Sequence, residues 1–458
     1  MYPCHLRAFV WLAPWALLMG RLSSGAELAG VVVTFERYAG PATVAAQSVA
    51  PHKLRIDVDP KTEGASLVMR VELPTSGRHA WPAADVEVRD ARGRALAVRR
   101  SGIEWHRLLI PVPAVRDTYF VQAVAPPGGR PLLPAEQERH LTDQATSLNL
   151  TIARWHDGRK AALSIRFDDS HPSHLSKAIP ILREYGFRGT FMVNPGGREP
   201  NSRRRSDFEE HRAKWEGCAR RGDQEFANHS AHHRGAIGDE DTEAEIGDAA
   251  RAIWQLFPGK SKLTALNLGG GTLWETTRPL SYYLDKYHLF DASGSSTGMD
   301  DTYGNRVANF RRLLEQHIER GLWCRIHYHY IGAGLSSSEA NFRAALDIAK
   351  EREAVLWIAG MAEIHKYQTE RNGASLALVR SDAQHLTFKL SCLTDPGLYD
   401  QPLTIEVRAA TPRSLERIAV KDTQGKARAV RTVDVAGQAV ARFEVAPRAA
   451  AYTIALSP

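Results

Sequence analysis

Residues 162–170 read ALSIRFDDS, an apolar run that ends in two adjacent carboxylates, Asp168 and Asp169. Such a run is typical of a buried strand. Two like charges at its end repel each other, and a bound cation would explain why both are present. Strand-like and helix-like segments alternate from about residue 153 onward. This alternation predicts parallel βα units, and seven or eight such units close into a barrel.

The composition is that of a globular protein. The chain has 458 residues, of which 43% are hydrophobic and 24% are charged, and this length suits two or three domains. The formal net charge is +7, which is small for a chain of this size. We find no dense stripe of Lys and Arg with interleaved aromatic residues. The composition therefore argues against binding to nucleic acid.

Two further domains are expected on either side of the βα units. Short β-branched runs separated by Pro, Gly and Asp fill residues 27–130 and again residues 372–458, which predicts two β-sandwich-like domains. Residues 125–131 are rich in Pro and Gly, and together with the polar residues after them they predict a linker over 131–152. The βα units occupy 153–371. We therefore expect an α/β protein with a distorted (β/α)7–8 barrel between N-terminal and C-terminal β-sandwich domains.

The N-terminus is typical of a secretory signal peptide. Residues 1–26 contain the basic Arg7, an apolar core over 8–20, and Ser24 and Ala26 at the −3 and −1 positions of a cleavage site. The core is too short to span a bilayer comfortably, because about 20 apolar residues are needed. No later stretch is apolar enough to be a membrane helix. We expect a secreted or periplasmic protein without a membrane span in the mature chain.

A cluster of histidines follows the strand-like segment QEFA at residues 224–227. His229 and His233 are four residues apart, so one helical turn would place both imidazoles on one side, whereas His232 is out of phase. With one carboxylate from the end of the 162–170 strand, they make a set of two His and one Asp. Three such ligands leave coordination positions open, which suits Zn²⁺ or another first-row divalent metal. The other carboxylate would lie beside the water that the metal activates and accept its proton.

Each of these features alone is common on a solvated loop. Their combination is more specific, because both clusters fall at strand C-terminal ends, where βα barrels place their sites.

These two clusters resemble motifs of the polysaccharide deacetylase family, also called the NodB-homology or carbohydrate esterase 4 family. RFDD at 166–169 is similar to the family's TFDD, and HSAHH at 229–233 matches H-[ST]-x-x-H in full. The resemblance is strong over 158–235 and weaker over the rest of 153–371. It implies a distorted barrel of the NodB type and a metal-dependent N- or O-deacetylase of acetylated polysaccharide, with zinc as the expected metal and Co²⁺ or Ni²⁺ as alternatives.

The resemblance also implies roles for individual residues. Asp168 would be the general base, and Asp169, His229 and His233 would bind the metal. A late histidine at a strand end would be the general acid that protonates the leaving group. The segment WCRIHYHYI over 323–331 offers His329, near the end of a strand, with His327 as the second choice.

Two other family motifs differ here. The third should follow the strand that begins at Leu263, but Asn267–Thr272 stands there without the arginine that orients the base. Gly270 and Gly271 in this stretch are predicted to bind substrate through backbone N–H groups, although they also fit a plain turn. Arg166 replaces the family's threonine two residues before Asp168. We expect it, as a further substrate-site residue, to supply the missing guanidinium, unless it faces outward.

The fourth motif is not recognisable in FDASGSSTGMDD over 290–301, so the residue that tunes the acid is not predicted. The expected function is a secreted hydrolase that removes acetyl groups from a polysaccharide by metal-activated water. Two alternatives stay open. One is a hydrolase of a non-glycan amide or ester, and the other is a catalytically inactive glycan-binding protein that keeps the metal ligands.

Overall fold

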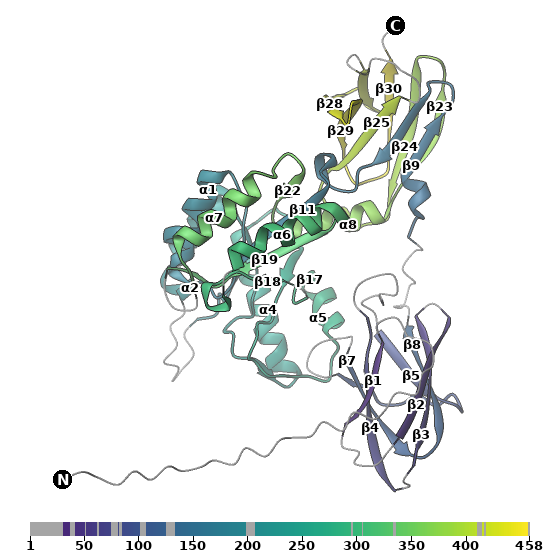
Figure 1. The fold of residues 1–458 in the computed structure, drawn as a ribbon, viewed down its shortest axis with the longest axis vertical. Coiled ribbons are helices and arrows are strands. Elements are labelled where there is room, and N and C mark those ends of the chain that lie inside the picture. The colour runs from purple at the N-terminus through teal and green to yellow at the C-terminus, as the bar shows by residue number, and fades with distance from the viewer. Residues whose placement is uncertain are drawn as a thin grey trace, which may run out of the picture. The chain divides into compact units, whose positions relative to one another are not determined.

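A computed structural model gives the fold of the chain in two compact units, residues 1–129 and residues 130–458 (Figure 1). The signal peptide expected over residues 1–26 lies outside the described residues. Within the described part of the chain, no helix is long and apolar enough to cross a membrane. The structure describes residues 31–36, 42–50, 52–61, 64–74, 81, 85–100, 107–124, 133–197, 207–294, 296–304, 306–332, 336–409, 415 and 418–456.

The described residues of the first unit form two antiparallel sheets around one core, as the alternating apolar pattern predicts. One sheet has the order β1-β4-β7-β6 and the other β2-β3-β8-β5. In β3, for example, Leu54, Ile56 and Val58 alternate into the core between the sheets. The strands are β1 (Val32–Glu36), β2 (Ala42–Ala50), β3 (Lys53–Pro60), β4 (Gly64–Glu72), β5 (Asp85–Asp90), β6 (Arg99–Arg100), β7 (Arg107–Ala114) and β8 (Asp117–Val124).

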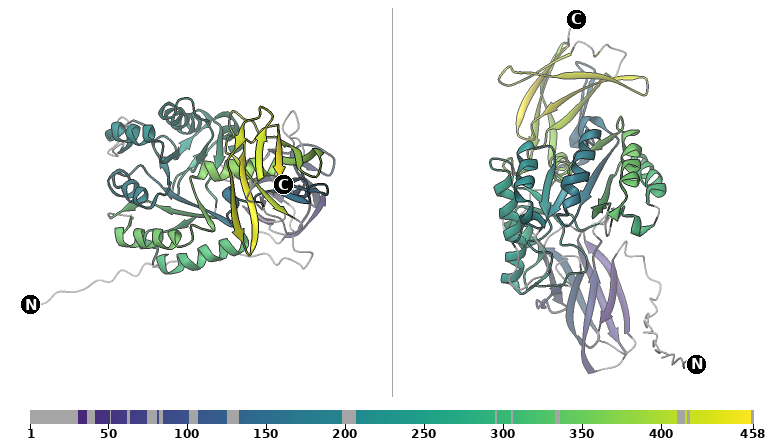
Figure 2. Two further views of the ribbon diagram at one scale, coloured as in Figure 1. Left: turned by 90° about the horizontal axis from the view of Figure 1, so that it is seen from above. Right: turned by 90° about the vertical axis from the view of Figure 1, so that its left-hand side faces the viewer.

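The second unit contains a curled parallel sheet with helices outside it, as shown in Figure 2. Its eight described strands have the order β17-β15-β13-β12-β11-β19-β18, and β22 pairs with the first half of β11. The strands are β11 (Ala161–Phe167), β12 (Thr190–Val193), β13 (Glu225–Asn228), β15 (Thr264–Leu266), β17 (Leu289–Asp291), β18 (Thr297–Gly298), β19 (Trp323–Tyr328) and β22 (Leu356–Ile358).

The two edge strands of this sheet, β17 and β18, are consecutive in the chain. Among the described residues β17 pairs only with β15 and β18 only with β19, yet a short segment, 292–296, joins β17 to β18. The sheet therefore curls into a distorted barrel that stays open along this seam. The expected (β/α) barrel is present in this open form.

Strand β11 lies in the middle of the sheet, and all seven of its residues are buried. Leu163, Ile165 and Phe167 pack into the core beneath the helices. The alternate residues Ser164 and Arg166 face the inside of the barrel. A strand that is buried on both faces explains why the sequence reads as an almost continuous apolar run.

The connections after the strands are mostly helical, with several short elements among them. A π-helical segment, η3 (His174–Ala178), runs into α1 (Ile179–Tyr185), which ends at Gly186 in a left-handed conformation (φ 72°). The other helices are α2 (Asp207–Glu210), α3 (Arg212–Arg221), α4 (Asp239–Leu256), α5 (Leu280–Lys286), α6 (Arg306–Arg320), α7 (Glu339–Lys350) and α8 (Met361–Asn372). The short elements are η2 (His156–Gly158), η4 (Asp301–Tyr303), β14 (Ala236–Ile237), β16 (Trp274–Glu275), β20 (Tyr330–Ile331) and β21 (Ser336–Ser337).

A β-sandwich follows α8, with the sheet orders β28-β29-β25-β10-β9 and β23-β24-β30-β26-β27. Its strands are β9 (His140–Asp143), β10 (Leu148–Ile152), β23 (Ala374–Ser381), β24 (His385–Cys392), β25 (Leu403–Ala409), β26 (Ile418–Asp422), β27 (Ala427–Arg428), β28 (Val430–Val435), β29 (Gln438–Val445) and β30 (Ala450–Leu456), with η1 (Glu136–Arg139) before β9.

The segment predicted as a linker, 131–152, is therefore structured over much of its length. Strand β10 lies between β9 and β25, and Leu148, Leu150 and Ile152 join the core of the C-terminal sandwich. Arg139, just before β9, donates hydrogen bonds to the backbone carbonyls at the end of α8. The sandwich is thus built from two parts of the chain on either side of the barrel.

Candidate metal centre

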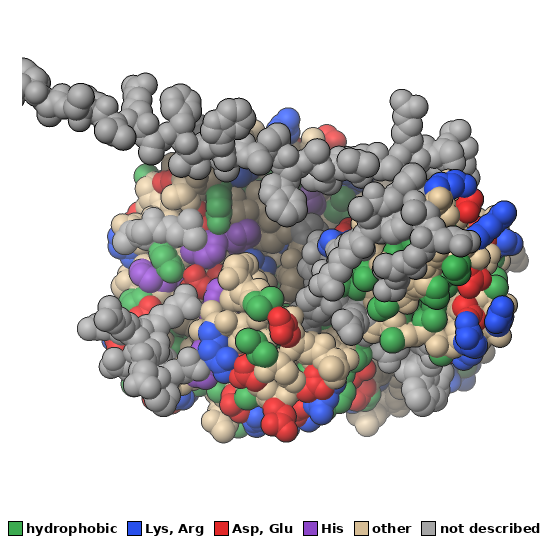
Figure 3. Space-filling model, turned by 90° about the horizontal axis from the view of Figure 1, so that it is seen from below, with side chains coloured by type: hydrophobic (Ala, Val, Ile, Leu, Met, Phe, Trp, Pro, Cys, Tyr) green, Lys and Arg blue, Asp and Glu red, His purple; other side chains and the backbone are tan. Residues whose placement is uncertain are grey.

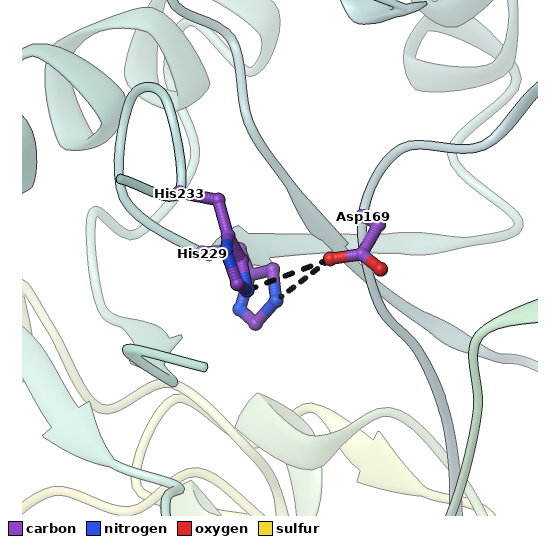
Figure 4. Close-up of side chains that lie close together, drawn as sticks. All are labelled: Asp169, His229 and His233. Atoms are coloured by element: carbon purple, nitrogen blue, oxygen red, sulfur yellow. Dashed lines mark ion pairs between the residues drawn. The ribbon is translucent and has the colours of Figure 1, made fainter. Parts of the chain in front are cut away.

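Three side chains converge at the carboxyl ends of the central strands (Figure 4). Asp169 follows β11, and His229 and His233 follow β13. The Nε2 atoms of His229 and His233 lie 3.3 Å and 3.6 Å from Asp169 Oδ1. The structure thus brings together the three residues that the sequence predicts as metal ligands.

The spacing of these atoms fits a divalent metal. Metal–ligand bonds of 2.0–2.1 Å in tetrahedral geometry place the donor atoms about 3.3 Å apart, close to the two distances found here. The side chain of His229 is 1% exposed, whereas those of His233 and Asp169 are 17% and 21% exposed. One side of the cluster is therefore open to solvent, and Figure 3 shows histidine side chains gathered at a hollow in the surface.

The surroundings of His229 prepare its Nε2 atom for a metal. Nδ1 of His229 lies 2.7 Å from the backbone carbonyl of Asn267, which can only accept a hydrogen bond. Nδ1 therefore carries the proton and Nε2 is left with its lone pair. On the other side, the side-chain amide of Asn194 donates to the carbonyls of His229 and Ser230.

Residues 229–233 form a tight loop, so the predicted helical turn is wrong. Ser230 and His233 are in the left-handed region, with φ of 62° and 54°. Local hydrogen bonds compete with a helix here: Ser230 N donates to the side chain of Asn228, and His233 N donates to Ser230 Oγ. The loop still places both imidazoles on one side. His232 is directed elsewhere, to Glu245, so it lies apart from the other two histidines as expected, although not through a helical turn.

The left-handed backbone at Asp169, with φ of 78°, separates it from Asp168. Its Oδ2 atom accepts a hydrogen bond of 3.5 Å from the hydroxyl of Tyr330. Burial alone would raise the pKa of Asp169, but hydrogen bonding by His229 and positive charge on the nearby histidines, whenever these rings are protonated, outweigh it. The pKa of Asp169 therefore lies far below its usual range, as suits a carboxylate ligand.

Asp168 is buried, with its side chain 4% exposed. Its Oδ2 atom lies 2.9 Å from a guanidinium nitrogen of Arg166 and 3.5 Å from the side-chain amide of Asn267. Its Oδ1 atom accepts no hydrogen bond from the described residues. Burial raises the pKa of Asp168, but the nearby positive charge, that of Arg166 above all, brings it below the usual value. Asp168 is thus an ionised carboxylate with one acceptor atom left for a proton.

Arg166 makes the ion pair that the sequence analysis expects. It is buried, so the alternative of an outward-facing surface residue is wrong. Its second terminal nitrogen donates to the carbonyl of Ala292, in the segment that joins β17 to β18. The guanidinium is therefore held by the segment at the seam of the barrel, and it fixes the orientation of Asp168. A contact of Arg166 with substrate stays a prediction.

The glycine loop contacts the site at one residue that the sequence analysis did not select. A Cβ atom on Gly269 would overlap Nε2 of His233, and Gly269 has a φ of 74°. By contrast, Gly270 and Gly271 are exposed, and a Cβ on either would meet no atom within 4 Å. Their predicted binding of substrate stays a prediction.

His329 has a carboxylate partner that the motif search missed. Its Nδ1 atom lies 2.6 Å from Oδ2 of Asp300, and its backbone N–H donates to Oδ1 of the same residue at 3.1 Å. Burial lowers the pKa of His329, but the hydrogen bond to the fully buried Asp300 and the charges of Asp168 and Asp169 raise it above the ordinary value. The signal available in the sequence was the doubled carboxylate of Asp300 and Asp301 after a short strand.

His327 differs from His329 in its electrostatics. Its Nδ1 atom lies 3.0 Å from Ser296 Oγ. Burial, followed by the charge of Arg166, lowers the pKa of His327 to about 4. The surroundings of His327 therefore favour its uncharged form, whereas the carboxylates near His329 favour its protonated form, which supports His329 over His327 as the acid.

Part of the barrel matches a family model, and the chain is similar to several solved structures. A family model described as Polysaccharide deacetylase matches residues 156–282. Solved structures similar to this chain include a family 4 carbohydrate esterase from Streptomyces lividans, with 18% identity, a TM-score of 0.32, and coverage of 44% of this chain and 94% of that one. A polysaccharide deacetylase from Bacillus cereus is 14% identical, with a TM-score of 0.29 and coverage of 44% and 91%.

One curated relative extends beyond the barrel. A gellan lyase from Bacillus sp. is 21% identical over 293 residues, which are 56% of this chain and 11% of that protein. This chain therefore spans only a small part of that relative.

Replacing Gly269 tests the packing around His233. We expect Gly269→Ala to weaken Zn²⁺ binding about tenfold or more, because the added methyl group displaces the His233 ring from its ligand position. Gly271→Ala is the matched control, because Gly271 has a similar φ of 73° and a Cβ there meets no atom within 4 Å, and it should leave the affinity within about twofold. Competition titration with a chelator measures both. Equal zinc affinities for the two variants would contradict the assignment of His233 as a ligand.

Replacing Asp300 tests its effect on His329. In Asp300→Asn the imidazolium loses its carboxylate partner, so the pKa of His329 should fall. Titration of the His329 ring by NMR in the metal-free protein measures this pKa. Because the protonated form is then lost at lower pH, an activity that needs it should decline at lower pH than in the wild type. A pKa of His329 that stays the same or rises in the variant would show that Asp300 does not stabilise the charged ring.

Proposed function

The central barrel of this chain belongs to the polysaccharide deacetylase family, and on that premise we propose that the protein is a metal-dependent hydrolase that removes N- or O-acetyl groups from a polysaccharide. The observation that carries the proposal is the convergence of Asp169, His229 and His233, next in sequence to Asp168, whose Oδ1 atom accepts no hydrogen bond from the described residues. Zinc is the expected metal, because two imidazoles and one carboxylate form a typical catalytic zinc set.

The two neighbouring carboxylates have different roles: Asp169 is a metal ligand and Asp168 is the base. Asp169, His229 and His233 would bind the ion. A divalent cation at this position supplies Lewis acidity, which lowers the pKa of a water molecule and stabilises negative charge on the acetyl carbonyl oxygen. Asp168 accepts the proton of the attacking water at Oδ1, because Oδ2 is engaged by Arg166.

His329 completes the reaction as the general acid. Its Nδ1 atom faces Asp300, which leaves Nε2 to donate a proton to the departing sugar nitrogen or oxygen. The bond between the acetyl carbon and the sugar atom breaks as this proton is transferred. Acetate and a free amine or hydroxyl on the glycan are the products.

The positions of Arg166 and Asp300 favour an enzyme over an inactive glycan-binding protein. The inactive alternative rested on the missing third and fourth family motifs. Arg166 contacts the base from within the first motif, and Asp300 contacts the acid. A binding protein would need neither contact. The family description and the gellan lyase relative, which is named after a polysaccharide, support a glycan over a non-glycan amide or ester.

We further propose that the protein acts outside the cytoplasm. The basic, apolar and small-residue pattern of residues 1–26 supports export by a signal peptide. An acetylated polysaccharide of a cell wall or of the surroundings would then be the substrate class.

An acetate-release assay with an Asp168 variant tests the proposed reaction. The zinc-loaded wild type should release acetate from at least one of chitin oligomers, peptidoglycan and acetylated xylan. Asp168→Asn should lower the rate about 10²–10⁴-fold, because the amide cannot accept the proton of water. Its zinc content, measured by elemental analysis, should equal that of the wild type.

Asp248→Asn is the matched control, since Asp248 is exposed on α4 and pairs with Arg251 there. It should keep wild-type activity. Zinc bound to the wild type without acetate release from any of the glycans would refute the proposed function. It would favour the binding protein or the non-glycan hydrolase.

A further inference from the structure

One fully buried histidine near the site has no role in the proposed reaction. His174 lies at the start of the π-helical segment η3, and its side chain has no solvent exposure. Its ring is surrounded by aromatic rings, with centroids 5.5 Å from Phe167, 5.6 Å from Phe191 and 6.4 Å from Trp215. A polar ring in such surroundings is costly unless it makes a hydrogen bond. π-helical turns are also frequent at functional sites.

The hydrogen bond of His174 goes to the general acid. Nε2 of His174 lies 2.5 Å from the backbone carbonyl of His329, 155 residues later in the chain. The residue before it makes a second bond to the same backbone segment in the opposite direction, because Ser173 Oγ accepts the N–H of Ile331 at 3.0 Å. The segment that follows Asp169 is thereby tied to the backbone over residues 329–331.

This tie and Asp300 hold opposite ends of the same residue. Asp300 binds the N–H and the ring of His329, and His174 binds its carbonyl. The two contacts therefore hold the residue from both sides of its Cα atom. Together they define where the ring of His329 lies relative to the metal ligand Asp169. Asp169 is on the same segment as His174, five residues before it.

The chemistry of the ring supports a neutral donor. A carbonyl only accepts, so Nε2 of His174 carries the proton and Nδ1 is unprotonated. Within the described part of the chain Nδ1 has no hydrogen-bond partner, which a charged ring would require. Burial, the largest effect, lowers the pKa of His174 to about 4, so the ring stays neutral over the range in which the site would work.

We propose that His174 is a positioning residue that aligns the general acid His329 with the metal site through its bond to the His329 carbonyl. This inference rests on the proposed function. It predicts that loss of the donor lowers the rate of the chemical step and leaves substrate and metal binding nearly unchanged, since His174 contacts neither.

Three variants of the zinc-loaded protein test the inference on the glycan that the wild type deacetylates. His174→Phe fills the aromatic cage without a donor, and its kcat per bound zinc should fall about 10- to 100-fold, with KM within about twofold. His174→Gln can donate from its amide and should recover most of that loss. Ser176→Ala, on the exposed side of η3, should match the wild type. A kcat in His174→Phe within twofold of the wild type would overturn the inference, as would the absence of recovery in His174→Gln.

An NMR measurement on the wild type keeps the inference testable if a variant does not fold. The ring nitrogen shifts of His174 should report a proton on Nε2 that exchanges slowly with solvent, and a proton on Nδ1 would overturn the inference. A wild type that releases no acetate refutes the proposed function, and the positioning role with it. An active wild type with an unaffected His174→Phe refutes the positioning role alone.

Discussion

The whole site depends on the two adjacent carboxylates at the end of β11, Asp168 and Asp169, having different partners. Side by side in one environment they would share a proton or repel each other. The left-handed backbone of Asp169 turns its side chain toward the two histidines, while Asp168 remains on the inside of the barrel beside Arg166. Two chemically identical groups thereby acquire the separate properties of a ligand and a base.

The parallel sheet makes this division possible because it gathers the ends of strands that are distant in sequence. The carboxyl ends of β11, β13, β15, β18 and β19 supply the two carboxylates, the histidine pair, Asn267, Asp300 and His329. Backbone groups fix several of these side chains. The Asn267 carbonyl sets the tautomer of His229, and the backbone N–H of His329 is bound by the same carboxylate as its ring. Residues around the ligands therefore determine which atoms are free to react.

The sequence predicts the ligands well because they lie in two local clusters. RFDD and HSAHH each place their side chains within five residues, at the ends of strands that the apolar pattern reveals. The contact between Arg166 and Asp168 is also local, since residues two apart on a strand share a face. The geometry of 229–233 was not predictable in this way, because the side chains of Asn228 and Ser230 replace the helical hydrogen bonds.

Pairings between strands that are distant in the chain could not be predicted from the sequence. Asp300 becomes the partner of His329 only because the short strand β18 pairs with β19. Strand β10 belongs to the C-terminal sandwich only because β25, some 250 residues later in the chain, pairs with it. Neither β18 nor β10 has a sequence pattern that indicates which strand it pairs with. A polar strand such as β9 has the composition of a linker.

The central claim is that one divalent ion binds between Asp169, His229 and His233. An X-ray absorption spectrum at the zinc edge, recorded with one equivalent of Zn²⁺ per chain, tests it most directly. The account predicts two imidazole nitrogens and carboxylate oxygen at about 2.0–2.2 Å, and it predicts that the imidazole scattering is reduced in His229→Ala. Zinc coordinated without imidazole, or a spectrum that is the same in this variant, would contradict the account.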